Sequence, residues 1–102
     1  MTKKNIMNLK NKKAVLIKPD GSYESVEPKN KSSFTLERMQ SMVEGYIQML
    51  PCNEDGFILI VNEEAGLGKL FQENIRGSMY YKYGRTTMLK GNVLMTKQNY
   101  IK

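Results

Sequence analysis

The residues best suited to chemistry lie in one short run, Arg-Gly-Ser-Met-Tyr-Tyr-Lys-Tyr-Gly-Arg at positions 76–85. This run holds three tyrosines and three cations in a chain of 102 residues that contains no histidine. Aromatic rings can stack on nucleobases while cations hold phosphates, and tyrosine and arginine also serve as anchors in protein interfaces. The run is therefore a candidate binding surface, unless its aromatic side chains fill a core.

Helical periodicity divides the run into structural and candidate binding residues. Asn74 can cap a helix that we expect over 75–83. The stripe at spacing i, i+4, i+8 consists of Ile75, Met79 and Tyr83, and Tyr80 flanks it. Because aromatic and apolar residues at helical spacing usually face a core, we expect this stripe to be buried. The remaining candidate binding residues are Arg76, Tyr81, Lys82, Arg85 and Lys90.

Three other runs could carry catalysis, and each lacks part of the motif it would need. Gly-Leu-Gly-Lys at 66–69 is too short for a phosphate loop and is followed by Leu70 instead of a hydroxyl residue. Glu63 and Glu64 follow an apolar strand pattern, but neighbours on a strand point to opposite faces, so solvated loop acids are expected. Cys52 has no partner base, and one cysteine without histidine excludes a Cys/His zinc site. We therefore expect a protein that is not an enzyme and that has no cofactor and no metal.

Length and composition favour one small domain in a reducing compartment. A chain of 102 residues with 40% hydrophobic residues has room for one core. The longest apolar run, 57–61, is too short to span a membrane, and residues 1–13 have cations but no apolar segment typical of a secretory signal. A single cysteine fits a reducing environment. A cytoplasmic location, within a host cell, is the expectation.

The net charge of +6 is distributed unevenly along the chain. Residues 1–31 contain eight lysines and three acids, whereas residues 32–73 contain seven acids and two cations. From Asn74 onward there are six cations and no acid. This asymmetry indicates an anionic partner for the basic end, although lysine-rich tails can also simply keep a small protein soluble.

Turn residues and periodicity predict an α+β fold. The expected strands are 13–18, 23–27, 46–50, 57–62 and 88–96, and the expected helices are 36–44 and 75–83. Pro-Asp-Gly-Ser at 19–22 joins the first two strands as a hairpin, and Thr35 is expected to cap the first helix. The order β-β-α-β-β-α-β implies a mixed or antiparallel sheet of about five strands, with two helices mainly on one face and 57–62 as its central strand.

The domain organisation expected from these patterns has three parts. Residues 1–12 form a basic flexible tail, 13–96 form a single α+β domain, and 97–102 form a C-terminal tail.

Five segments in order resemble a known family. They are IKPDGSYESVEP, FTLERMQSMVEGYIQMLP, ILIVNEEAGL, NIRGSMYY and GNVLMT, and they cover about residues 13–96. The set is similar to a domain-of-unknown-function family met in phages, plasmids and large DNA viruses. The family's Gly-Gly-Tyr-Ile is here Glu44-Gly45-Tyr46-Ile47, and its Ala-Thr pair is here Gly77-Ser78.

The resemblance implies a context and no established chemistry. Small basic proteins of mobile elements often bind and block a host component. Asn62, Glu63 and Asn74 match the family pattern, and we expect them to fasten a loop to the sheet and not to bind a ligand.

Three functions agree with these observations. The first is a non-catalytic anti-defence inhibitor of a phage or mobile element, which binds a host protein such as a CRISPR nuclease and covers or mimics a nucleic-acid contact. The second is a sponge that sequesters a nucleotide-derived signal. The third is a nucleic-acid-binding accessory protein, whose affinity would fall steeply with salt. A homodimer through edge strands is also reasonable.

Overall fold

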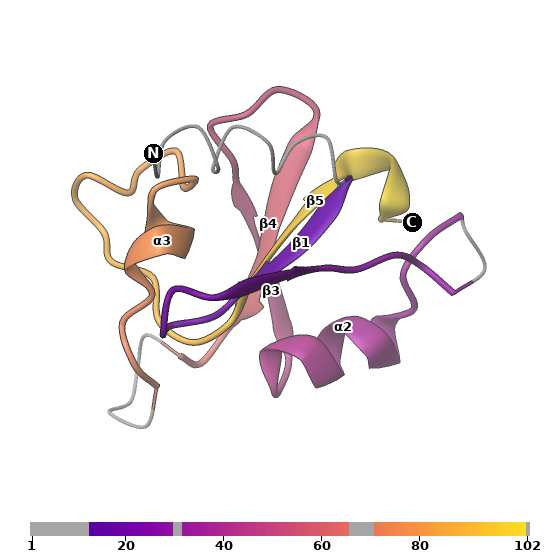
Figure 1. Cartoon of the computed structure of the whole chain (residues 1–102), viewed down its shortest axis with the longest axis horizontal. Helices are drawn as coiled ribbons and strands as arrows, with labels where there is room; N and C mark the ends of the chain where they lie inside the picture. Colours follow the sequence, from indigo (N-terminus) through magenta and orange to yellow (C-terminus); the bar gives the residue numbers. More distant parts are fainter. Residues whose placement is uncertain (1–12, 30–31, 66–70, 102) are drawn as a thin grey trace.

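A five-stranded sheet organises the part of the chain that the computed structural model describes, residues 13–29, 32–65 and 71–101 (Figure 1). The strands are β1 (Ala14–Ile17), β2 (Tyr23–Ser25), β3 (Ile47–Pro51), β4 (Phe57–Asn62) and β5 (Val93–Lys97). The helical elements are α2 (Leu36–Val43), α3 (Ile75–Ser78) and the 3-10 turn η2 (Gln98–Tyr100). The spatial order is β2-β1-β5-β4-β3, and every neighbouring pair is antiparallel. The expected α+β class and element order are confirmed.

The middle of the sheet is β5, and β4 lies beside it as a second interior strand. We expected the apolar run 57–62 to be central, and it is interior but one place away from the centre. β5 begins later than the expected residue 88, because Lys90 pairs with Glu73 and Gly91 turns with a positive φ of 78°. That turn brings the loop back into the sheet at Val93.

The β1–β2 hairpin forms as the turn residues predict. Val15 pairs with Ser25 and Ile17 with Tyr23. The Asp20 carboxylate accepts hydrogen bonds from the backbone N–H and the hydroxyl of Ser22, at 2.8 and 2.6 Å. Gly21 adopts a φ of 91°, which a side chain would disfavour.

Each face of the sheet carries its own core. One core contains Val15, Ile17, Phe57, Leu59, Val61, Tyr80, Leu89, Val93 and Met95. The other contains Ala14, Leu16, Phe34, Met39, Val43, Ile60 and Leu94. Alternate strand residues supply the two cores because successive side chains point to opposite faces of a strand.

The two helices cover opposite faces, and our expectation of both on one face is wrong. α2 supplies Met39 and Val43 to the second core. α3 lies on the first, where a Cβ at Gly77 would come within 2.7 Å of Val93 Cγ2. Figure 1 shows the strands between the two helices. The sheet is buried on both sides because β1, β4 and β5 are apolar on both faces, which periodicity read for one strand at a time does not reveal.

α2 is a short helix with defined ends. The Thr35 hydroxyl accepts a hydrogen bond from the Arg38 N–H at 3.1 Å, which confirms the expected N-cap. The helix ends at Glu44, which adopts a left-handed conformation with φ 66°. The next residue, Gly45, allows a close approach of the two chain segments, since a Cβ there would lie 2.6 Å from the Asn62 Nδ2.

The second helix is one turn long, and the expected helix over 75–83 is wrong beyond Ser78. The chain leaves the helix because its backbone groups bond to the end of β3. The Lys82 N–H donates to the Pro51 carbonyl at 3.0 Å, and the Tyr80 carbonyl accepts from the Asn53 N–H at 2.8 Å. These cross-chain hydrogen bonds replace the ones a longer helix would make.

The end of the described chain packs back onto the domain. We expected residues from 97 onward to be a tail; Lys97 closes β5, and η2 follows it. The Tyr100 ring meets the Phe34 ring edge-on, with centroids 5.7 Å apart. The expected basic tail over 1–12 and the Gly-Leu-Gly-Lys run at 66–69 lie outside the described residues. Within the described ranges, no helix has the length and apolar character needed to cross a membrane.

Candidate functional site

A pocket of about 480 Å³ lies where the loop after α3 meets the end of β3. Its lining includes three of the five residues selected from the sequence, Tyr81, Lys82 and Arg85. The rest of the lining consists of Asn53, Ile75, Ser78, Met79, Gly84 and Met88. The pocket is thus walled by two cations, an aromatic ring and several apolar side chains.

Backbone pairing holds this loop in place. Tyr81 forms an isolated antiparallel bridge with Cys52, just beyond β3. The Asn53 side-chain amide donates to the Met79 carbonyl at 2.7 Å. A Cβ on Gly84 would lie 2.0 Å from the Ser78 carbonyl oxygen, so the chain can fold back there only with glycine. The loop that forms the pocket is therefore held by hydrogen bonds to the end of β3, and these bonds fix the backbone positions from which its side chains project.

Two tyrosines and a lysine form a small aromatic cluster at the surface. The Tyr81 and Tyr83 rings meet edge-on, with centroids 5.7 Å apart and an interplanar angle of 84°. The Lys82 Nζ lies 5.8 Å from the centroid of the Tyr83 ring, within the range of a cation–π contact. Tyr83, which we expected in the core, thus belongs with the binding candidates.

The buried stripe expected from the sequence is wrong. Ile75, Met79 and Tyr83 are 65, 54 and 53% exposed, and the flanking Tyr80 is only 3% exposed. With one helical turn in place of nearly three, the i, i+4, i+8 spacing no longer selects one face. The exposure of Ile75 and Met79 was not predicted, because their spacing matched the buried face of a longer helix, and that longer helix does not form.

Arg76 and Lys90 do not line this pocket. The Arg76 guanidinium lies 5.6 Å from the centroid of the Tyr23 ring on β2. Lys90 lines a neighbouring pocket of about 300 Å³, which shares Tyr81 and Met88 with the first. The structure therefore groups three of the five selected residues, places a fourth next to them, and separates Arg76.

Burial leaves Tyr80 and Cys52 poorly suited to act as nucleophiles or bases. Desolvation raises the pKa of the Tyr80 hydroxyl well above its usual range, although the Arg76 charge opposes this shift. Desolvation likewise raises the pKa of the half-buried Cys52 thiol. Both groups are therefore held in their neutral forms at physiological pH.

Two buried asparagines hold the loops that carry the surface. The Asn74 amide donates to the Ile17 and Gly91 carbonyls at 3.0 and 2.8 Å, and its Oδ1 accepts from the Gly77 N–H at 2.8 Å. The Asn62 amide donates to the Val43 and Glu44 carbonyls, both at 3.1 Å. These contacts agree with our expectation that both residues fasten loops to the sheet.

The acids after β4 do not converge on a site. Glu63 and Glu64 are both exposed. The Glu63 N–H donates to the Tyr46 carbonyl at 2.9 Å, and the Glu64 N–H donates to Asn62 Oδ1 at 2.7 Å. Among the described residues, no group of three or more His, Cys, Asp or Glu side chains could hold a metal ion.

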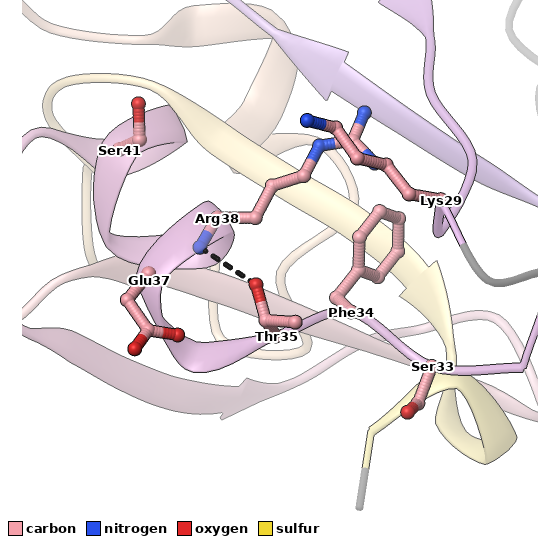
Figure 2. Close-up of a pocket in the computed structure, with 7 residues that line it drawn as sticks. All are labelled: Lys29, Ser33, Phe34, Thr35, Glu37, Arg38 and Ser41. Carbon is pink, nitrogen blue, oxygen red and sulfur yellow. Dashed lines mark hydrogen bonds between the residues drawn. The ribbon is translucent and has the colours of Figure 1, made fainter.

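A second pocket, of about 570 Å³, lies at the start of α2 and was not predicted from the sequence (Figure 2). Its lining is Lys29, Ser33, Phe34, Thr35, Glu37, Arg38 and Ser41. The Arg38 guanidinium lies 5.4 Å from the Phe34 ring centroid and donates to the Glu27 carbonyl. Because Arg38 is engaged by the protein itself and Glu37 opposes an anion, this pocket is a weaker binding candidate.

Comparison with known proteins places the chain in a family. The model of that family, described as a Domain of unknown function (DUF3846), matches residues 12–100. No curated protein and no solved structure matches the chain. Since the match covers nearly every residue, the chain belongs to the DUF3846 family.

Proposed function

We propose that this chain is a non-catalytic binding protein that docks a partner protein through the Tyr81 surface. We define the Tyr81 surface as Ile75, Met79, Tyr81, Lys82, Tyr83, Arg85 and Met88. The observation that carries the proposal is that four large apolar side chains are exposed together: three of them line one pocket whose backbone is hydrogen-bonded to the end of β3, and Tyr83 lies against the pocket residue Tyr81. The four are Ile75, Met79, Tyr83 and Met88.

The composition of this surface favours a protein partner over a small ligand or nucleic acid. Tyrosine, methionine and arginine are enriched at protein interfaces, and methionine adapts to irregular partners. Stacking on bases needs open aromatic faces, but the Tyr81 ring has an edge-on neighbour and is half-buried. The apolar side chains would supply binding energy by leaving water.

The charge of the surface favours an acidic partner. Lys82 and Arg85 are both exposed, and the residues that line the pocket they share include no acid. Cations at the rim of an apolar patch speed association with an acidic surface and select against basic ones.

We further propose that the partner is a host protein and that the chain acts against a host defence. This part of the proposal rests on the family resemblance noted in the sequence, which implies a context of phages and plasmids, where a small basic protein can block a host nuclease, a CRISPR nuclease among them. The acidic centre of a nuclease would complement Lys82 and Arg85. This role needs stoichiometric binding and no catalytic group.

The structure weakens the proposal of a nucleotide sponge. That ligand site would use Arg76, Tyr81, Arg85 and Lys90 together. Arg76 packs on Tyr23, and Lys90 lines a different pocket from Arg85. Melting shifts with added nucleotides would revive this alternative, and salt-sensitive binding that nuclease treatment abolishes would favour a nucleic-acid partner.

The test is capture of proteins from a host lysate, treated or not treated with nuclease, followed by mass spectrometry. We expect a nuclease-resistant partner to be retained by the wild type and lost by the Lys82→Glu, Arg85→Glu double variant. Lys29→Glu, which reverses an exposed lysine beside the second pocket, is the matched control and should retain the partner. Equal retention by the double variant would refute the proposal.

A further inference from the structure

The two edges of the sheet differ in how they are protected. β2 is three residues long, its Glu24 lies 3.9 Å from the Lys18 ammonium, and Arg76 covers its Tyr23. β3, at the other edge, has the sequence Ile-Gln-Met-Leu-Pro and carries no charge. Exposed edges without charges or covering groups are templates for pairing with another strand.

The backbone of β3 shows which groups are available. The backbone carbonyl of Tyr46 points toward β4, since it accepts a hydrogen bond from the Glu63 N–H at 2.9 Å. The backbone carbonyl of Pro51 points away from β4, toward the outer edge, since it accepts from the Lys82 N–H at 3.0 Å. Backbone groups alternate in direction along a strand, so those of Ile47 and Met49 also face outward. Among the described residues, the covering of this edge begins only at Pro51.

We propose that β3 pairs with β3 of a second copy of this chain, antiparallel, about a twofold axis at Gln48. In this register Ile47 lies opposite the second copy's Met49, and the reverse pair is identical by symmetry. The outward backbone groups of both pairs then make four hydrogen bonds. The two five-stranded sheets become one continuous sheet of ten strands.

The side chains of the strand complement themselves in this register. Ile47 and Met49 meet on the α2 face, where Ile47 already packs on a core and Met49 is exposed. Tyr46 lies opposite Leu50 on the other face, and Gln48 meets Gln48 with amides able to bond to each other. No like charges come together, which is what a symmetric interface requires.

Charge at the ends of the strand also favours a second copy over another chain. In the same register the second copy's Tyr46 lies opposite Leu50, and its chain leaves the edge there, because Lys82 already occupies the place beside Pro51. The exposed Glu44 of the second copy, two residues before Tyr46, therefore reaches the end of the strand where the exposed Lys82 lies. The symmetry creates this acid–base contact twice.

The experiment uses the central position of Gln48, whose side chain is exposed. Gln48→Lys and Gln48→Glu each place like charges opposite one another in a homodimer, whereas a mixture of the two places opposite charges together. We expect the wild type to sediment at about twice 11.8 kDa, each variant alone at the monomer mass, and the equimolar mixture at the dimer mass again. Ser25→Lys and Ser25→Glu on the β2 edge are matched controls and should remain dimeric.

Two results would overturn the proposal. A wild type that remains a monomer at high concentration would leave this edge to an extended peptide of another protein or to no partner. Dimers that persist in both single Gln48 variants would place the interface elsewhere. Because the experiment uses the purified chain alone, its result does not depend on the partner of the Tyr81 surface.

Discussion

The neighbouring residues Asn74 and Ile75 have opposite burial: one belongs to the buried hydrogen-bonded support of the loops, and the other to the proposed binding surface. Asn74 is polar and fully buried, whereas Ile75 is apolar and 65% exposed. Asn74 and Asn62 hold loops by bonding to backbone carbonyls, while Ile75, Met79, Tyr83 and Met88 face solvent. Buried amides therefore build the support in this region, and apolar side chains remain available for a partner.

The largest expected effect is the loss of folding stability when the buried Asn74 is replaced. Asn74→Ala removes hydrogen bonds to Ile17, Gly91 and Gly77, and leaves buried backbone groups without partners. We expect a loss of about 3–5 kcal/mol in the free energy of unfolding, measured by urea denaturation. Asn53→Ala, an exposed residue with one amide contact to Met79, is the control and should cost about 1 kcal/mol or less. Equal losses at the two positions would contradict the role given to Asn74.

Two adjacent residues, Met79 and Tyr80, sharpen the comparison. Tyr80→Ala should cost about 3–5 kcal/mol, because its ring is buried in the first core. Met79→Ala should change the free energy of unfolding by less than about 0.5 kcal/mol, since its side chain is exposed. Thermal or urea unfolding of both variants tests this. A loss of about 2–5 kcal/mol for Met79→Ala, typical of a buried methionine, would support the predicted buried stripe of Ile75, Met79 and Tyr83 and contradict the structure.

The smallest expected effect is at the end of α2. Glu44 has a left-handed backbone, which glycine adopts without steric cost. Glu44→Gly should therefore raise the free energy of unfolding by about 0.5 kcal/mol, the net of relieved strain and added unfolded-state entropy. Glu37→Gly in the first turn of α2 is the control, and it should lower stability by about 1 kcal/mol. A loss of stability in Glu44→Gly would show that the side chain itself is needed.

Local signals in the sequence were sufficient for much of this fold. The β1–β2 turn, the Thr35 cap and the apolar run of β4 each depend on residues close together in the chain. The non-helical conformation of residues 79–83 could not be predicted in the same way. It depends on hydrogen bonds to Pro51 and Asn53, which are distant in sequence and come close only in the folded sheet. The placement of α3 on the opposite face from α2 is likewise determined by tertiary packing, and no local sequence pattern encodes it.

The candidate site was predictable in part for the same reason. Charge and aromatic content identified Tyr81, Lys82 and Arg85, which do share a pocket. Arg76 was grouped with them by sequence distance, yet the short helix directs it to Tyr23. The exposed apolar members, Ile75, Met79 and Met88, carry no sequence signal that distinguishes a binding surface from a core.

The most direct test of the Tyr81 surface removes its apolar side chains without touching its charges. Retention of partner proteins from a nuclease-treated host lysate is compared between the wild type and the Ile75→Ser, Met79→Ser double variant, matched for folded protein. We expect retention to fall at least about tenfold, because about 1.4 kcal/mol of lost apolar burial is enough for that change. Retention equal to that of the wild type would contradict the claim that these exposed side chains form the binding surface.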